Sequence, residues 1–148
     1  MMIREVSKSD GGKIFEFLQD GIGSEYLDQV TQEFMDAISG RLYGFVAANG
    51  DNILGYITCQ RDVQTYRIGT IAVRSSSRGK GIGTTLINHL IDYLNREGAD
   101  VNTLNVVTDA DAGDNIRFYS RCGFKISGYV NDEFIPGIGQ VHLTRTLR

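Results

Sequence analysis

Three glycines and two cations lie within six consecutive residues, Arg78-Gly79-Lys80-Gly81-Ile82-Gly83. The β-branched run before them predicts a buried strand, and the apolar residues after them recur at helical spacing, so the glycines fall at a helix N-terminus. Amides there have no partner within the helix, the helix dipole favours an anion, and glycine lets the backbone approach a ligand closely. This chemistry suits a phosphate or pyrophosphate. The predicted ligands are Arg78, Gly79, Lys80, Gly81, Ile82, Gly83 and Thr84.

Two nucleotide-binding motifs fit this stretch poorly. A P-loop places Ser or Thr directly after its lysine, whereas Gly81 follows Lys80. A dinucleotide-binding loop needs a third small residue where Leu86 stands. Its acidic partner ends a strand, whereas Asp100 follows the predicted helix. The loop therefore favours a different phosphate ligand.

A second informative segment is residues 118–124, Phe-Tyr-Ser-Arg-Cys-Gly-Phe, at the end of a short predicted helix. Together the two segments resemble the GNAT acetyltransferase superfamily. Its pyrophosphate loop reads Gln/Arg-x-x-Gly-x-Gly/Ala, as residues 78–83 do, and its Phe-Tyr-x-x-x-Gly-Phe element follows later in the chain, as residues 118–124 do. The close match runs from Thr70 to Phe124.

The resemblance implies transfer of an acetyl group from acetyl-coenzyme A (acetyl-CoA) to a primary amine, by direct attack in a ternary complex. In this superfamily the pantetheine arm pairs with the edge of the fourth strand where it splays from the fifth, here the backbone of Ile71, Ala72 and Val73. A backbone N–H near Val73 would stabilise the charge that develops on the thioester oxygen. Acetyl-CoA is the expected co-substrate.

Tyr119 matches the family tyrosine that protonates the leaving thiolate. A phenol with an ordinary pKa of about 10 stays protonated at neutral pH. Phe118 and Phe124 are interpreted as core packing around the same helix. Family members commonly place an asparagine seven residues before the tyrosine, where this chain has Ala112. Asn115, about one helical turn later, is the residue available to contact the pantetheine.

The sequence offers no clear acceptor for the amine's proton. Many relatives use a glutamate on the fourth or fifth strand, but residues 66–70 and 104–106 contain no carboxylate. Asn105 could hold a water that carries the proton away, while Glu25, Asp28 or Glu33 could reach the acceptor side from the second helix. The simplest interpretation of these three acidic residues is a solvated helix face.

The acceptor could be a small metabolite amine, an amino sugar, an antibiotic or a peptide N-terminus. The acidic residues at positions 25–28 and the net charge of −3 favour a cationic acceptor. A rival interpretation is a non-catalytic acyl-CoA-binding sensor that kept the phosphate loop and lost the base. A nucleotide-binding protein is a third.

Composition narrows the class of protein. Residues 1–148 fit one domain, and 41% hydrophobic content is enough for a core. The net charge of −3 gives no basic field for nucleic acid, no apolar run reaches membrane-helix length, and the N-terminus lacks a signal peptide's apolar core. We therefore expect a cytoplasmic protein without nucleic-acid or membrane partners, as a monomer or a homodimer.

Metal binding is not expected from the cysteines and histidines. Cys59 and Cys122 are far apart and the two histidines are distant, so they make no convincing zinc site. The two thiols are expected to be small buried groups.

The elements that must position these residues alternate along the chain. Strands are expected at residues 3–6, 42–48, 53–61, 66–73, 103–107, from 124, and at 140–147, with helices after residues 10 and 24, at 81–97 and at 114–122. Asp10, Ser24 and Asp114 are candidate N-caps, and Gly98 and Gly123 candidate stops. The expected fold class is α/β, more narrowly α+β: a GNAT-like, mixed, mostly antiparallel sheet of about seven strands flanked by about four helices.

Overall fold

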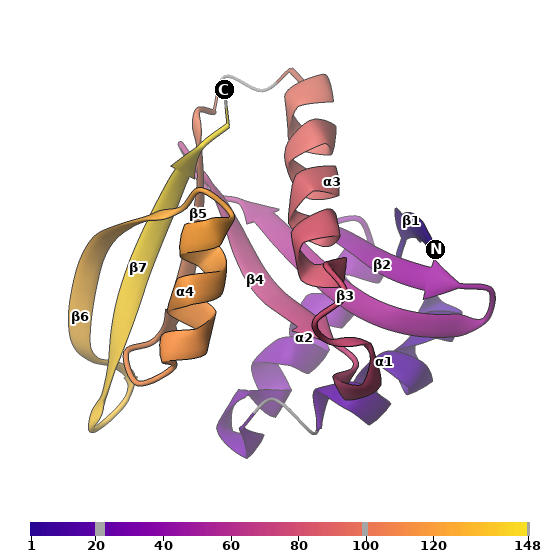
Figure 1. Ribbon diagram of the computed structural model, residues 1–148, viewed down its shortest axis with the longest axis horizontal. Coiled ribbons are helices and arrows are strands. Elements are labelled where there is room, and N and C mark those ends of the chain that lie inside the picture. Colours follow the sequence, from indigo (N-terminus) through magenta and orange to yellow (C-terminus); the bar gives the residue numbers. More distant parts are fainter. Residues whose placement is uncertain (20–22, 99–100, 148) are drawn as a thin grey trace.

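A seven-stranded sheet organises the computed structural model, which describes residues 1–19, 23–98 and 101–147 (Figure 1). Its strands are β1 (Met2–Glu5), β2 (Tyr43–Asn49), β3 (Asn52–Arg61), β4 (Tyr66–Val73), β5 (Thr103–Asp109), β6 (Lys125–Ile135) and β7 (Ile138–Thr146). The spatial order is β1-β2-β3-β4-β5-β7-β6, and each neighbouring pair is antiparallel except β4 and β5. The expected mixed, mostly antiparallel sheet is confirmed.

Two pairs of helices cover opposite faces of this sheet. In Figure 1, α3 (Ile82–Arg96) and α4 (Gly113–Arg121) lie in front, while α1 (Gly11–Leu18) and α2 (Leu27–Ile38) lie behind. Short 3-10 turns occur at Lys8–Asp10, Ser24–Tyr26 and Ser75–Ser77. No helix in the described part of the chain is long and apolar enough to span a bilayer.

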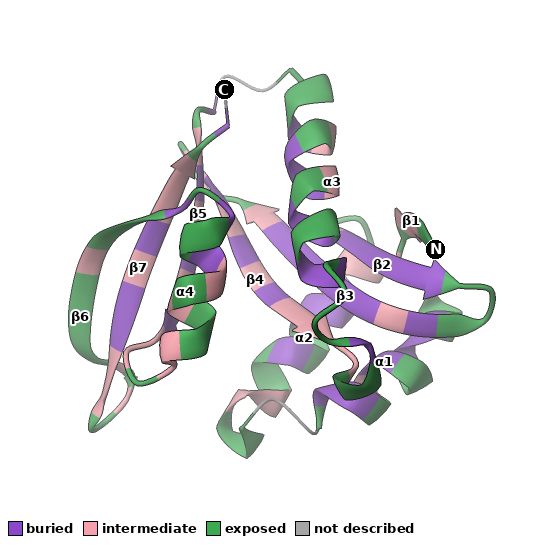
Figure 2. Cartoon of the chain, viewed as in Figure 1, coloured by how far each residue is buried: buried purple, intermediate pink, exposed green. Residues whose placement is uncertain are grey.

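Each face has its own hydrophobic core. The α3 side chains that point at the sheet are buried with those of β2 to β5 and β7, whereas α1 and α2 pack on a second cluster that includes Val46 and Tyr56 (Figure 2). Cys59 and Cys122 are both buried and free, as expected. The two faces are therefore packed independently.

The helix starts differ from the expected caps. The Asp10 side chain makes no capping bond to α1. Its two carboxylate oxygens each accept a 2.8 Å bond from Arg4, and one also accepts from the amide of Ser7, which caps the preceding 3-10 turn. Ser24 begins a 3-10 turn and caps nothing, and α4 starts at Gly113, ahead of Asp114. A stronger ionic partner displaced the cap at Asp10. The stops are confirmed, since Gly98 and Gly123 have φ values of +68° and +90° directly after their helices.

The strand β4 leaves β5 early. The two strands are in register only at Tyr66–Leu104 and Arg67–Asn105. On its other side β4 carries a bulge, because Ile68 pairs with Cys59 but Ile71 with Ile57, which leaves residues 69–70 opposite one residue of β3. The predicted splay is confirmed, and it opens the sheet beside the glycine-rich loop.

Candidate active site

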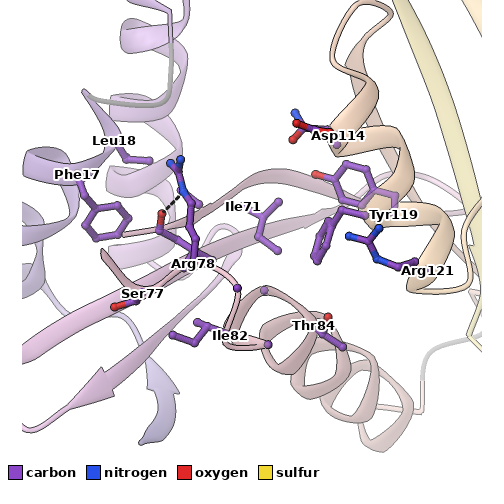
Figure 3. Close-up of a pocket in the computed structure, with 17 residues that line it drawn as sticks. Phe17, Leu18, Ile71, Ser77, Arg78, Ile82, Thr84, Asp114, Tyr119 and Arg121 are labelled. Atoms are coloured by element: carbon purple, nitrogen blue, oxygen red, sulfur yellow. Dashed lines mark hydrogen bonds between the residues drawn. The ribbon is translucent and has the colours of Figure 1, made fainter. Parts of the chain in front are cut away.

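A pocket of about 710 Å³ lies at this opening (Figure 3). Its volume is in the range usual for small-molecule sites. Most of the predicted cofactor ligands line it: Ile71, Ala72, Val73, Arg78, Gly79, Gly81, Ile82, Gly83, Thr84 and Asn115, together with Tyr119. Lys80, Asn105 and Glu25 are not among its lining residues. The pocket therefore unites segments that are far apart in the sequence.

The loop between β4 and α3 leaves its backbone amides free. The amide of Thr85 makes the first bond of α3, to the carbonyl of Gly81 at 3.0 Å. The amides of residues 79–84 have no hydrogen-bond partner in the part of the chain that the structure describes. Such a row of N–H groups at a helix N-terminus is an anion-binding site.

The loop glycines serve two different purposes. Gly79 and Gly81 have φ values of +77° and +80°, in the left-handed region that other residues rarely adopt. Gly83 is helical, and a Cβ there would lie 3.0 Å from Cζ of Phe118. Gly83 therefore allows α3 to approach the Phe118 ring on α4, while the other two glycines shape the loop.

Tyr119 reaches the pocket from α4. Its residue is 6% exposed, and its ring lies edge-on to Phe118 and Phe124, with centroids 5.3 and 5.7 Å away. Figure 3 shows the side chain among the pocket residues. Burial raises the pKa of the Tyr119 phenol, which corrects the ordinary value expected from the sequence. The phenol is protonated at neutral pH and can act as an acid.

The start of α4 places Asn115 against the end of β5. Its Nδ2 donates a 3.3 Å hydrogen bond to Oγ1 of Thr108, and its side chain lines the pocket. Asp114 lines the pocket beside it and pairs with Arg117. Asn115 is therefore held at the pocket wall by a bond that Ala112 could not supply.

Three cations lie around the loop, in different relations to it. Nε of Arg78 donates to the carbonyl of Val73 at 3.2 Å, so this side chain turns toward β4 (Figure 3). Lys80 is exposed. Arg121 lines the pocket from α4, and among the described residues it has no ion pair or side-chain hydrogen bond. Arg121 is thus an unpaired cation of the pocket wall that sequence reasoning missed.

The candidate proton acceptors differ in how far they are buried. Glu25 and Asp28 are exposed, whereas Glu33 is 9% exposed and turned toward the sheet, so the expectation of a solvated face is wrong for Glu33. The Oδ1 atom of Asn105 accepts a 2.8 Å hydrogen bond from the Thr144 hydroxyl. Glu33 is therefore the only one of these three carboxylates that the fold buries.

A second polar contact joins the turn before α2 to the sheet. The Tyr26 hydroxyl donates to Oδ1 of Asp109 at 3.2 Å, and Nε2 of Gln140 donates to the same oxygen at 2.7 Å. Burial is the main cause that raises the pKa of Tyr26, and the charge of Asp109 adds to it. Within the described residues, no group of three or more His, Cys, Asp and Glu side chains could hold a metal ion.

The other lining residues that sequence reasoning missed come from two sources. Phe17 and Leu18 come from α1, where their spacing indicates only an apolar helix face; Ser77, Asp114 and Phe118 lie near predicted site residues. Arg121 stands inside the Phe-Tyr-x-x-x-Gly-Phe segment, so a cation within that motif was the one available signal. Arg121 and Thr84 line the same pocket from α4 and α3 (Figure 3), so their placement depends on how these two helices pack.

The proteins to which this chain is similar in sequence are acetyltransferases. The sequence profile of the acetyltransferase (GNAT) family matches residues 13–124. The uncharacterized N-acetyltransferase YvbK of Bacillus subtilis is 29% identical over 106 residues, which cover 71% of this chain and 67% of that protein. N-alpha-acetyltransferase 30 of Schizosaccharomyces pombe is 33% identical over 87 residues, covering 55% of this chain and 57% of that protein.

Solved structures share the fold. A protein of Desulfovibrio desulfuricans assigned to the GNAT family superposes with a TM-score of 0.88 at 16% identity, over 99% of both chains. An aminoglycoside 6'-N-acetyltransferase complexed with coenzyme A gives a TM-score of 0.79 at 18% identity, over 100% of this chain and 98% of that one. At these identities the likeness concerns the fold alone.

Proposed function

The chain belongs to the acetyltransferase (GNAT) family, and from this premise we propose that it is an N-acetyltransferase. It moves an acetyl group from acetyl-CoA to a primary amine by direct attack within a ternary complex. The family's general reaction is acetyl transfer from acetyl-CoA to an amine. The proposal for this chain rests on its own residues.

The observation that carries the proposal is the meeting of three features in one pocket. The amides of residues 79–84 have no partner in the described chain, β4 has left β5 beyond Arg67, and the Tyr119 side chain lines the same space. These features suit a ligand with a pyrophosphate, a chain of amides that can pair with a strand edge, and a leaving group that needs a proton. Coenzyme A has all three.

The loop amides and the free Arg121 bind the phosphates, and the backbone of Ile71, Ala72 and Val73 pairs with the pantetheine. Acetyl-CoA supplies the activated acetyl group as a thioester. Tyr119 holds the proton that the departing thiolate needs, and Phe17 and Leu18 supply an apolar part of the pocket wall.

The acceptor is proposed only as a primary amine. The relatives' names include an aminoglycoside as one acceptor and an alpha nitrogen as another. The net charge of −3 favours a cationic amine for this chain. The cytoplasmic location and the single domain over residues 1–148 stay predictions from the sequence.

Release of free thiol from acetyl-CoA, measured against a panel of amines, tests the function. The panel should contain putrescine, kanamycin and an alanyl tripeptide, with calorimetric titration of coenzyme A and ATP in parallel. An N-acetyltransferase binds coenzyme A in preference to ATP and releases thiol with at least one amine. Binding without turnover would instead establish the acyl-CoA sensor, and preference for ATP would establish a nucleotide-binding protein.

A further inference from the structure

Glu33 is a buried carboxylate on α2, on the opposite face of the sheet from Tyr119. Its Oε1 atom accepts a 2.5 Å hydrogen bond from the Thr70 hydroxyl, and Oγ1 of Thr58 lies 3.5 Å from the same oxygen. Its Oε2 accepts from Nε2 of Gln29 at 3.3 Å. These donors are neutral, so they hold the carboxylate in place without supplying a counter-charge.

The charge of Glu33 has no counter-ion. Among the described residues, no Lys, Arg or His nitrogen lies within 4.0 Å of its carboxylate. A buried carboxylate without a cation is costly, because the neutral donors only partly replace the water it has lost. A cationic group beside Glu33 would therefore offset this cost.

A second group near Glu33 also lacks a partner. Tyr56 is 0% exposed, and its hydroxyl makes no hydrogen bond in the described part of the chain. Tyr56 and Thr58 lie two residues apart in β3 and so point to the same face. Tyr56 packs in the same cluster as Val30 and Phe34 of α2, the helix that carries Glu33. Burial raises the pKa of Tyr56, and the charge of Glu33 adds to this effect. The Tyr56 hydroxyl, which can donate and accept a hydrogen bond, is thus unpaired, as is the Glu33 carboxylate's charge.

The position of Glu33 relates this polar cluster to the pocket. Thr70, which bonds Glu33, lies in the β4 bulge beside Ile71, and Ile71 lines the pocket. The bulge lies beyond Arg67, where β4 is free of β5. Glu33 therefore lies behind the β4 bulge on the α2 face, next to the strand segment that lines the pocket, while Tyr119 lines the pocket from α4.

We propose that Glu33 binds the protonated amine of the acceptor at the β4 bulge and takes its proton, which makes the substrate class a basic primary amine, cationic at neutral pH. This deepens the proposed function and rests on it. Tyr56 has the free hydroxyl to accept a further N–H of the same ammonium. Glu25 and Asp28, being exposed, have no part in this step.

The proton balance of the reaction is complete with these two side chains. Glu33 receives one proton from the ammonium, and the neutral nitrogen forms the C–N bond to the acetyl carbon as the C–S bond breaks. Tyr119 gives its proton to the sulfur and regains one from the N–H that the new amide must lose. Glu33 then releases its proton to solvent, so the products are the amide, the free thiol and one proton.

The test compares Glu33→Gln with Glu16→Gln, the same change at an exposed residue of α1. Each protein is assayed with ethylamine and with trifluoroethylamine, which is mostly neutral at pH 7. Glu33→Gln should lower kcat/KM for ethylamine by about 10²-fold or more, as for loss of a general base, and should lower it far less for the neutral amine. Glu16→Gln should match the wild type with both amines.

Binding gives a readout apart from turnover. With the protein saturated by coenzyme A, ethylammonium should bind the wild type and bind Glu33→Gln about tenfold more weakly or not at all, with coenzyme A affinity unchanged. If Glu33→Gln does not fold, Glu33→Asp keeps the charge, and its activity should fall less for the charged amine than that of Glu33→Ala.

The outcomes separate the two proposals. Equal loss for both amines, or none, makes Glu33 a structural carboxylate and overturns this inference, while wild-type turnover leaves the acetyltransferase function standing. A wild type that binds ethylammonium through Glu33 but transfers nothing would overturn the function alone. A wild type that neither binds nor acetylates a charged amine overturns the inference directly.

Discussion

The two sides of the β4–β5 opening are built in different ways. On the α3 and α4 side, the polar groups that we propose bind the ligand are mostly backbone amides of one continuous loop, residues 79–84. On the α2 side they are side chains from separate elements: Glu33 from α2, Thr58 from β3 and Thr70 from β4. A loop carries its geometry in local sequence, whereas the second cluster exists only after long-range folding.

This difference explains how specific each side can be. Backbone amides bind any phosphate that reaches them, so the loop side suits a common co-substrate. A buried carboxylate that lacks a counter-ion favours a cationic ligand over neutral and anionic ones, because a cation offsets its desolvation best. The selective part of the reaction is therefore expected on the α2 side.

The largest effect should come from Tyr119→Phe, which removes a hydroxyl from the loop side and keeps the ring. We expect kcat to fall by about 10²–10⁴-fold, the usual loss for a general acid, with KM for acetyl-CoA changing far less. Because burial raises the pKa of Tyr119, the wild-type rate should fall only above the ordinary tyrosine pKa of about 10. Rate measurements across the alkaline range check this.

Tyr93→Phe is the matched control for that prediction. Tyr93 lies on α3, packs against Tyr43 and Phe45, and is absent from the pocket lining. Removing the Tyr93 hydroxyl should leave kcat unchanged, and should also leave unchanged the fall of kcat at high pH (the alkaline limb of the pH–rate profile). An undiminished rate in Tyr119→Phe, with the same alkaline limb as the wild type, would make Tyr119 a packing residue.

The next effect should come from the loop itself. Gly81→Val places a β-branched residue at a φ of +80°, so the loop must relax and its amides lose their alignment. Hydrogen bonds to charged groups contribute about 1.5–3 kcal/mol each, so coenzyme A affinity should weaken by about 10- to 100-fold. Calorimetric titration measures the dissociation constant.

Gly50→Val separates strain from binding. Gly50 lies in the β2–β3 hairpin with a φ of +62°, and a Cβ there would also meet nothing within 4 Å. Both substitutions should lower the free energy of unfolding by about 1–2 kcal/mol, but only Gly81→Val should weaken coenzyme A binding. Unchanged affinity in Gly81→Val would remove the phosphate role from this loop.

A smaller effect should follow from Arg121→Gln. The guanidinium is exposed and unpaired in the described chain, so a contact with phosphate is partly screened by water. We expect about a tenfold loss of coenzyme A affinity at low salt, which shrinks as ionic strength rises. Arg96→Gln, at the opposite end of α3, is the control and should change nothing. A salt-independent loss would indicate a structural role for Arg121.

The contrast between a local loop and a cluster assembled by long-range folding also decides what could be predicted from the sequence. The glycine loop, its strand and helix, and the Tyr119 helix were predictable because spacing and turn residues are local signals. The burial of Glu33 was not predictable, because its partner Thr70 is 37 positions away in the sequence. The amphipathic pattern of α2 places polar residues on the solvent side and gives no sign that one of them is buried. Asp10 was misjudged for a related reason, since its ionic partner Arg4 lies on another element.

The smallest effect should come from the acidic surface that the sequence singled out. Glu25 and Asp28 are exposed, so the double variant Glu25→Gln, Asp28→Asn changes only the long-range field felt by a cationic amine. Exposed charges contribute about 0.2–1 kcal/mol, which predicts a KM increase of about 1.5- to 5-fold for the amine and no change in acetyl-CoA affinity. The increase should vanish at high salt, where the Debye length falls to about 3 Å. Steady-state kinetics at two ionic strengths measures it. A large, salt-resistant increase would mean that these two carboxylates contact the acceptor, and the selective contact would then lie at the exposed N-terminal end of α2 instead of at buried Glu33.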